Sequence, residues 1–143
     1  MPERNPHIRS YAPDSDYPAV RKILEAGDLY YEPMDSAERL AEKIRRDPDS
    51  ILVAVASNQV LGTVSLMEDG KMPFIFRLAV DPDQRRQGIG RKLMEAAEDI
   101  LKSRGYKEIN ILVEEGDHEL QEYYLRQSYD RGNPYRWMVK ELK

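Results

Sequence analysis

The stretch LAVDPDQRRQGIGRKLMEAAE, residues 78–98, runs from an apolar strand through a turn and a glycine loop into an amphipathic helix. After Gly88 the apolar residues recur at helical spacing, and Gly105 is a natural end for this helix. A strand that turns into a helix in this way points the first unbonded N–H groups of the helix at one place, where the helix dipole adds about half a positive charge. The stretch therefore predicts a phosphate site.

The residue types of this loop suit an anion. Gly88 and Gly90 let the backbone approach a ligand without an intervening Cβ atom. Charge-assisted hydrogen bonds can come from the basic side chains Arg85, Arg86, Arg91 and Lys92. The loop lacks the Gly-Lys-Ser/Thr ending and the third glycine of other phosphate loops. A second interpretation stays open, in which the glycines make a tight connection and the arginines form a solvated rim.

The segments on either side predict a mixed α/β fold with an antiparallel front half. Strands are expected over HIRSY (residues 7–11), ILVAVAS (51–57), VLGTVSLM (60–67), FIFRLAV (74–80), EINILVE (108–114) and PYRWMVKEL (134–142). Helices are expected from Asp14 to Gly27 with Pro18 in the first turn, from Asp35 to Asp47 with Asp35 as N-cap, from Gly88 to Gly105, and from Asp117 to Gln127. A tight turn at Asn58-Gln59 should join the second and third strands.

Composition excludes several classes of protein. The chain has 143 residues, which predicts one domain over 1–143, and its 41% hydrophobic and 34% charged residues are typical of a soluble globular protein. No apolar run approaches the roughly 18 residues of a membrane span, and no apolar signal region opens the chain, so we expect a cytoplasmic protein with no membrane partner. The absence of cysteine excludes a disulfide framework and a thiolate nucleophile.

Charge and histidine content narrow the partners further. A formal net charge of -4 argues against a nucleic-acid partner, so the anion bound at Gly88 should belong to a small molecule. His7 and His118 have no second ligand at metal spacing, and we predict no metal. A Ser-His-Asp hydrolase is poorly supported because no Gly-x-Ser-x-Gly motif is present.

The stretch at residues 78–98 resembles the signature motif of the GNAT superfamily of N-acetyltransferases. The matching units are Leu78-Ala79-Val80, Asp81-Pro82 and Arg85-Arg86-Gln87-Gly88-Ile89-Gly90. The order of expected elements is similar to that family over nearly the whole chain. The resemblance implies the GNAT acyl-CoA N-acyltransferase fold, a central mixed and mostly antiparallel sheet flanked by about four helices. It also implies transfer of an acetyl group from acetyl-CoA to an amine-bearing small molecule or peptide, by direct attack in a ternary complex.

The resemblance implies a set of cofactor-binding residues. They are Leu78, Ala79, Val80, Arg85, Arg86, Gln87, Gly88, Ile89, Gly90 and Arg91. In the family the loop amides hold the pyrophosphate of coenzyme A, and the preceding strand pairs with the pantetheine arm. Here the Val80 N–H would donate to the thioester oxygen and stabilise the developing oxyanion by on the order of a few kcal/mol.

A tyrosine in a Tyr-x-x-x-Gly-Phe pattern is a second family feature. Here the pattern begins at Tyr124, with Ser128 in place of glycine and Tyr129 in place of phenylalanine. By resemblance Tyr124 is the proton donor to the departing thiolate, since a phenol stays protonated at neutral pH. The alternative is an ordinary surface or core aromatic, like its neighbour Tyr123. Asp117 stands where the family often has asparagine, and we expect it to cap the helix.

The general base is open. Glu114, at the end of the expected fifth strand, is the first candidate, against the alternative of an exposed strand-end carboxylate. Glu32 is a second candidate. Arg77 could face a carboxylate of the acceptor or pair with Glu114, and we expect the pair.

Acceptor specificity in this fold usually comes from the loop between the first two helices and from the last hairpin. Tyr30, Tyr31 and Glu32 would form a wall suited to a cationic amine, whereas the alternative is that the two tyrosines cover the edge of the core. Other classes stay open: an acetyl-CoA-binding sensor or interaction module with little turnover, and a module for nucleotide phosphate. A homodimer could form through the expected last strand, residues 136–141.

Overall fold

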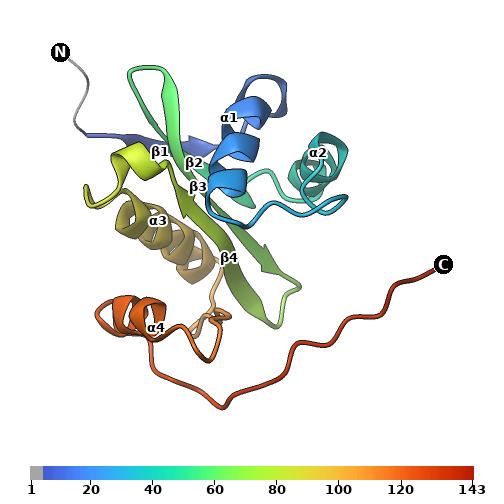
Figure 1. Ribbon diagram of the computed structural model, residues 1–143, viewed down its shortest axis with the longest axis vertical. Coiled ribbons are helices and arrows are strands. Elements are labelled where there is room, and N and C mark those ends of the chain that lie inside the picture. Colours follow the sequence, from blue (N-terminus) through green and yellow to red (C-terminus); the bar gives the residue numbers. More distant parts are fainter. Residues whose placement is uncertain (1–4) are drawn as a thin grey trace. The chain divides into compact units, whose positions relative to one another are not determined.

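A four-stranded antiparallel sheet organises the first of two units into which the chain divides, residues up to Ile111 and residues 112–143. The computed structural model describes residues 5–143. The strands are β1 (His7–Ser10), β2 (Ile51–Ala56), β3 (Gln59–Glu68) and β4 (Pro73–Val80). They lie side by side in chain order, each antiparallel to the next (Figure 1). The predicted α/β class and antiparallel front half are confirmed.

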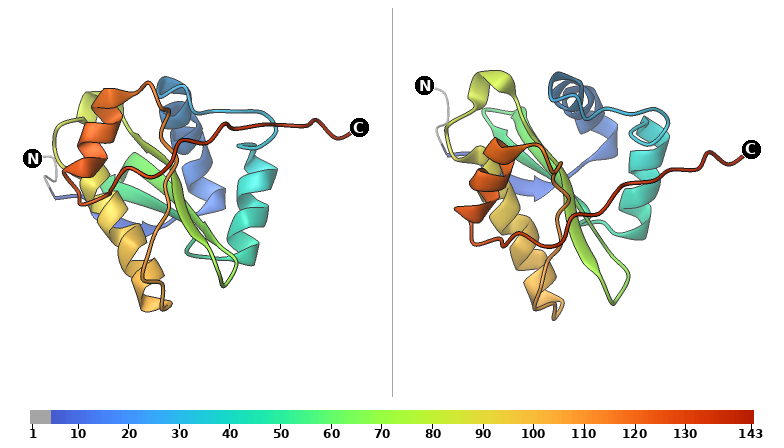
Figure 2. Two further views of the ribbon diagram at one scale, coloured as in Figure 1. Left: turned by 90° about the horizontal axis from the view of Figure 1, so that it is seen from below. Right: turned by 60° about the horizontal axis from the view of Figure 1, so that its bottom comes forward.

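Helices cover both faces of this sheet. Helices α1 (Pro13–Ala26) and α2 (Ala37–Arg46) lie on one face, and α3 (Ile89–Ser103) lies on the other (Figure 2). All six residues of β2 are buried, as a central strand covered on both faces requires. Its side chains alternate, and Ile51, Val53 and Val55 join one hydrophobic cluster with Val20 and Ile23 of α1.

The opposite face of the sheet approaches α3 closely at Gly62. A Cβ atom there would lie 3.0 Å from Leu93 Cδ1, 3.2 Å from Ile89 Cγ2 and 3.1 Å from the Ala79 carbonyl oxygen. Glycine thus allows the helix after the phosphate loop to pack directly on the strand. Of the apolar stripe that the sequence predicted for α3, Ile89, Leu93, Ala97 and Leu101 are buried, and Ala96 and Ile100 are partly buried. Gly105 follows the helix with φ +96°.

The starts of α1 and α2 differ from the prediction. Helix α1 begins with Pro13, whose missing N–H is tolerated there, and Pro18 lies inside the helix instead of in its first turn. The N-cap of α2 is Ser36, whose side chain accepts from Arg39 N–H at 3.2 Å. The prediction of Asp35 as the N-cap was wrong, because the Asp35 carboxylate accepts hydrogen bonds from groups outside this helix.

The hairpin turn between β2 and β3 lies one residue earlier than predicted. Ser57 and Asn58 have φ +51° and +61°, and β3 already begins at Gln59. Two consecutive residues with positive φ make the turn type whose twist matches that of the flanking strands.

Strand β4 contains one extra residue near its middle. Thr63 pairs with Ala79 and Ser65 pairs with Phe76, so two steps along β3 correspond to three along β4. Arg77 lies in this β-bulge with φ +56°, a left-handed conformation that is uncommon outside glycine. The bulge directly precedes Leu78, where the family motif begins.

The second unit contains α4 (His118–Leu125). Asp117 caps it as predicted, with its carboxylate accepting from Leu120 N–H at 3.0 Å. The helix is followed by Ser128 at φ +70°, a conformation that the glycine of the family pattern would adopt without strain.

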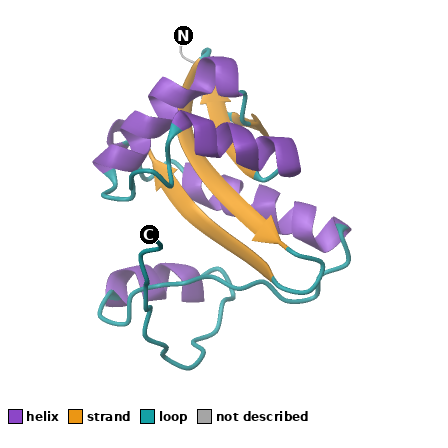
Figure 3. Ribbon diagram, turned by 90° about the vertical axis from the view of Figure 1, so that its right-hand side faces the viewer, coloured by secondary structure: helices purple, strands orange, loops and turns teal. Residues whose placement is uncertain are grey.

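The two strands predicted near the C-terminus were wrong. In residues 108–114 the structure has one isolated parallel bridge, Asn110 to Phe74, and within the described residues 112–143 it has no strand (Figure 3). The alternating pattern of the last segment shows that it could form a strand, but a strand also needs a hydrogen-bonding neighbour, which the pattern does not specify. In residues 5–143, no helix is long and apolar enough to span a membrane.

Candidate active site

The β-bulge decides which backbone amides of β4 face its outer edge. Before the bulge, Ile75 N–H donates outward to Asn110 O at 3.0 Å. After it, Asp81 N–H donates inward to Leu61 O of β3 at 2.8 Å. Successive amides of a strand alternate between its two sides, so the Val80 N–H faces the outer edge. Without the extra residue this amide would face β3.

The same alternation places the Leu78 N–H on the outer edge, two residues before Val80. Within residues 5–111, no strand pairs with this edge beyond the bridge at Phe74. Ala79, between the two, is buried with 8% of its surface exposed, which fixes the strand in the core. Two outward amides on a fixed strand can bind an extended polar chain as a further strand would.

The N-terminus of α3 follows after a short 3₁₀ turn, η1 (Pro82–Gln84). Gly88 is the N-cap with φ +78° and offers no side-chain hydrogen bond to the helix. The first backbone bond of the helix runs from Lys92 N–H to Gly88 O at 3.0 Å, so the amides of residues 89–91 precede it. A Cβ atom on Gly88 would have nothing within 4 Å, so the space beside the N-cap is open.

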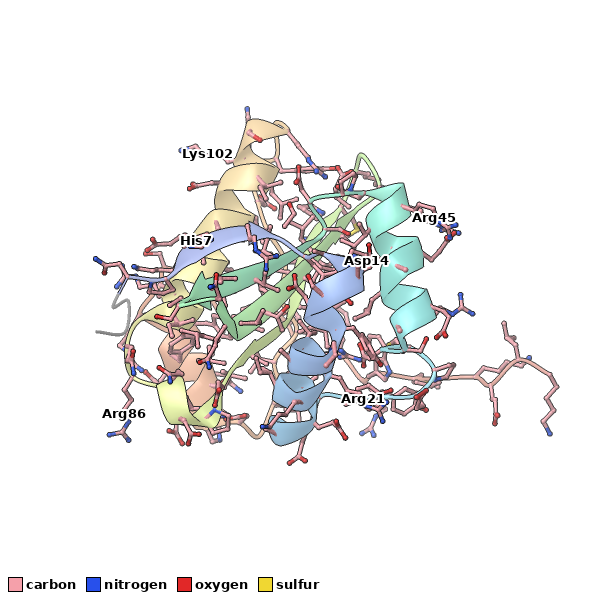
Figure 4. All side chains as sticks on the ribbon, turned by 90° about the horizontal axis from the view of Figure 1, so that it is seen from above. His7, Asp14, Arg21, Arg45, Arg86 and Lys102 are labelled. Atoms are coloured by element: carbon pink, nitrogen blue, oxygen red, sulfur yellow. The ribbon has the colours of Figure 1, made fainter. Side chains whose placement is uncertain are left out.

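The basic side chains of the loop differ in their freedom. Arg85 and Arg86 are exposed, and Figure 4 shows Arg86 projecting from the molecule. Arg91 pairs with Glu95 one turn along α3, with Nε to Oε1 at 3.0 Å. Gln87 Nε2 donates to Gln84 Oε1 at 3.3 Å within the loop. Arg85, Arg86 and the exposed Lys92 are therefore the cations most available to a phosphate.

The α1–α2 loop carries a hydrogen-bonded network. Tyr30 Oη donates to Glu32 Oε1 at 2.6 Å and lies 3.4 Å from Tyr17 Oη, and these contacts, the Glu32 bond first, raise the pKa of Tyr30. The Arg21 guanidinium lies 4.6 Å from the centre of the Tyr30 ring. Tyr31 is 61% exposed. Tyr30 packs against the core cluster while its hydroxyl joins this network, as the interpretation that the tyrosines cover the edge of the core expects. The wall for a cationic amine stays a prediction.

Arg77 pairs with Asp35, a partner that sequence reasoning missed. Arg77 Nε and Nη2 donate to the two carboxylate oxygens of Asp35, each at 3.2 Å. The Asp35 side chain is 5% exposed and also accepts from Tyr31 N–H at 2.9 Å. Asp35 thus occupies the Nε–Nη2 fork of the guanidinium, and the expected pair of Arg77 with Glu114 stays a prediction. Sequence distance hid the contact with Asp35, since 42 residues separate the partners.

The two remaining catalytic candidates belong to the second unit and are described within it. Tyr124 is buried at 9% exposure and makes edge contacts with Tyr123 and Tyr129. Burial, and then the neighbouring Tyr123, raises the pKa of Tyr124 to about 12, so its phenol holds its proton at neutral pH. Glu114 is exposed, and its carbonyl oxygen accepts from Gln121 Nε2 at 3.0 Å.

A model of the acetyltransferase (GNAT) family matches residues 17–129. The chain belongs to this family. The match runs through both units and includes the β4 edge, the glycine loop and Tyr124. An acetyltransferase of Pectobacterium atrosepticum is 31% identical over 123 residues, which are 86% of this chain and 86% of that protein. As a GNAT member with such relatives, the protein is an N-acetyltransferase.

Solved structures agree on the GNAT fold. The PaiA N-acetyltransferase of Thermoplasma acidophilum, solved with coenzyme A, has a TM-score of 0.74 at 21% identity, covering 85% of this chain and 87% of that one. An aminoglycoside acetyltransferase from an uncultured soil metagenomic sample, solved with sisomicin, has a TM-score of 0.73 at 22% identity, covering 96% and 97%. At these identities the likeness concerns the fold.

Proposed function

We propose that this GNAT enzyme transfers the acetyl group of acetyl-CoA to a primary amine by direct attack in a ternary complex, and that residues 1–143 act as one catalytic domain. The amine nitrogen bonds to the thioester carbonyl carbon, the C–S bond breaks, one proton leaves the amine and one joins the thiolate. The observation that carries the proposal is the outward Val80 N–H on the same segment that leads into the open N-terminus of α3.

Residues of the first unit fit acetyl-CoA as cosubstrate. The amides of residues 89–91 are aligned for a pyrophosphate, with Arg85 and Arg86 available to add charge. The outward amides of Leu78 and Val80 suit the amide groups of a pantetheine arm, and the Val80 N–H is assigned to the thioester oxygen. Bound coenzyme A in the PaiA acetyltransferase supports this cosubstrate class.

Proton transfer is assigned to Tyr124 and Glu114 of the second unit, with Glu32 of the first unit as an alternative base. Tyr124 is the proposed donor to the leaving thiolate, since its raised pKa keeps the phenol protonated. Glu114 is the proposed base for the attacking amine, with Glu32 of the acceptor loop as the alternative. Both carboxylates are exposed to solvent and can pass the proton on through water.

The acceptor is assigned to the α1–α2 loop. Tyr31 offers an exposed ring, and Glu32 an exposed carboxylate already oriented by Tyr30. These groups suit a cationic amine. The sisomicin complex of the structurally similar aminoglycoside acetyltransferase supports an amine-rich acceptor.

Calorimetric titration with acetyl-CoA, ATP and NADH tests the cosubstrate. We expect acetyl-CoA alone to bind with a Kd in the micromolar range, on the order of −8 kcal/mol. Equal binding of all three would indicate a general nucleotide-phosphate module instead. Tight binding without transfer to any amine in a screen would indicate an acetyl-CoA sensor.

Gly88→Glu tests the phosphate site directly. The carboxylate should repel the pyrophosphate and abolish acetyl-CoA binding, while the open space around Gly88 accommodates the side chain at the cost of backbone strain. Gly88→Ala is the matched control, because it imposes the same strain at φ +78° without the charge. Undiminished affinity in folded Gly88→Glu would refute the site.

A further inference from the structure

The ion pair between Asp35 and Arg77 lies where the acceptor loop meets the cofactor strand. Arg77 is in the β-bulge directly before Leu78, and Asp35 is at the end of the α1–α2 loop that carries Tyr30, Tyr31 and Glu32. The pair therefore connects the segment assigned to the acceptor with the segment assigned to the thioester. This inference rests on the proposed function.

The geometry of the pair occupies one of the two edges with which the Arg77 guanidinium can bind a carboxylate through two hydrogen bonds, the Nε–Nη2 edge. Its Nε and Nη2 both point at Asp35, at 3.2 Å each, and Nη2 also lies 3.4 Å from Met34 Sδ. A guanidinium binds carboxylates through such a fork of parallel N–H groups. Because Asp35 fills this fork, an acceptor carboxylate that binds Arg77 through Nε and Nη2 would have to displace it.

Displacement is unfavourable because Asp35 is buried. Its side chain is 5% exposed, and beside Arg77 it has one further donor, the Tyr31 N–H at 2.9 Å. A buried carboxylate that loses its cation is strongly destabilised. Arg77, at 23% exposure, remains close enough to solvent for a ligand to reach it once Asp35 no longer binds it.

The charges left free on the loop are negative. Asp28 and Glu32 are exposed carboxylates, and Glu32 is held by the Tyr30 hydroxyl at 2.6 Å. The cation beside these groups, Arg21, already pairs with Glu25 at 3.4 Å, so an acceptor carboxylate near the reacting amine would meet mainly negative charge. A carboxylate-free amine would meet mainly attraction.

We propose that Asp35 masks Arg77, that is, keeps it from binding a carboxylate of the acceptor. This enzyme thereby selects amines that carry no carboxylate group near the reacting amine. Asp35 and Arg77 are specificity-determining residues in this assignment, and neither takes part in bond making. Removing the charge of Asp35 converts Arg77 into a carboxylate receptor. In the wild type, this carboxylate-binding site is present but occupied by Asp35.

Kinetics with cadaverine and lysine, which differ by one carboxylate, tests the selectivity. The wild type should favour cadaverine in kcat/KM, and Asp35→Asn should lower the cadaverine-to-lysine ratio about tenfold. Asparagine keeps an oxygen for the Tyr31 N–H, so the loop retains that bond. In Asp35→Asn/Arg77→Gln, which lacks the guanidinium, the ratio should return toward the wild-type value. An unchanged ratio in Asp35→Asn that still binds acetyl-CoA normally would overturn the proposal.

Labelling with phenylglyoxal, which attacks unpaired guanidinium groups, gives a readout that needs no turnover. Peptide mass spectrometry should find Arg77 modified several-fold faster in Asp35→Asn than in the wild type, with exposed Arg85 as the internal reference. Equal rates would refute the masking. Transfer to neither amine by the wild type would refute the charge preference, and normal acetyl-CoA binding would then show that the cofactor site itself had not failed.

Discussion

Tyr124 combines burial with a raised pKa, and both bear on its proposed role as acid. With its pKa at about 12 the phenol keeps its proton through the neutral range. Tyr124→Phe removes only the hydroxyl, so kcat should fall about 10²-fold while acetyl-CoA affinity stays within about twofold. Steady-state kinetics and calorimetry measure the two effects, with Tyr123→Phe as the neighbouring control. Unchanged kcat would remove Tyr124 from the mechanism.

Ser128 holds a left-handed conformation that glycine adopts more easily. Its φ is +70°. At the end of α4, Ser128 N–H donates to Leu125 O and Tyr129 N–H donates to Tyr124 O. A non-glycine residue there costs roughly 1–2 kcal/mol, partly offset by the greater unfolded-state freedom of glycine. Ser128→Gly should therefore raise the free energy of unfolding by up to about 1 kcal/mol in urea titrations. Ser15→Gly in helix α1 is the control and should lower the free energy of unfolding. A lower free energy of unfolding in Ser128→Gly as well would contradict backbone strain at Ser128.

At the scale of elements, the contact between β3 and α3 depends on one missing side chain. In Gly62→Ala the new methyl would press on Leu93 and on the Ala79 carbonyl oxygen, 3.0 and 3.1 Å away. Overpacking of this kind should destabilise the fold by about 1–3 kcal/mol. Urea unfolding of Gly62→Ala and Gly116→Ala provides the comparison, because a Cβ at Gly116 meets nothing within 4 Å. Equal free energies of unfolding for both variants would show that the contact between β3 and α3 accommodates the added methyl group without a cost in stability.

The elements also show what sequence could predict. Strands β1–β4 and helix α3 follow from local periodicity, because burial on one or both faces leaves its period in the residues themselves. The bulge at Arg77 and its pair with Asp35 have no local signal, since they depend on register and on a contact across 42 positions. For the same reason the alternation in residues 134–142 indicated a strand without indicating a neighbour to pair with.

For the whole molecule, acid stability should depend on a charged cluster where α2, α3 and β3 end. Arg104 donates to both carboxylate oxygens of Asp47, at 2.7 and 3.0 Å, and lies 3.8 Å from Glu68. The hydrogen bond from Arg104 is the largest cause that lowers the pKa of Asp47. A carboxylate whose pKa is lowered by folding stabilises the native state above its unfolded pKa of about 3.9 and loses this contribution as pH falls through the folded value.

Arg104→Gln should therefore lower the free energy of unfolding by about 1 kcal/mol at pH 7. The difference in this free energy between the variant and the wild type should become smaller as pH falls below about 4. Urea titrations of both proteins at pH 7 and pH 3 measure this difference. Arg46→Gln is the control, since the Arg46 side chain is 81% exposed and its pair with Glu42 should contribute little at either pH. A gap for Arg104→Gln that stays equal at both pH values would mean that the guanidinium stabilises the fold by packing and not through the charge of Asp47.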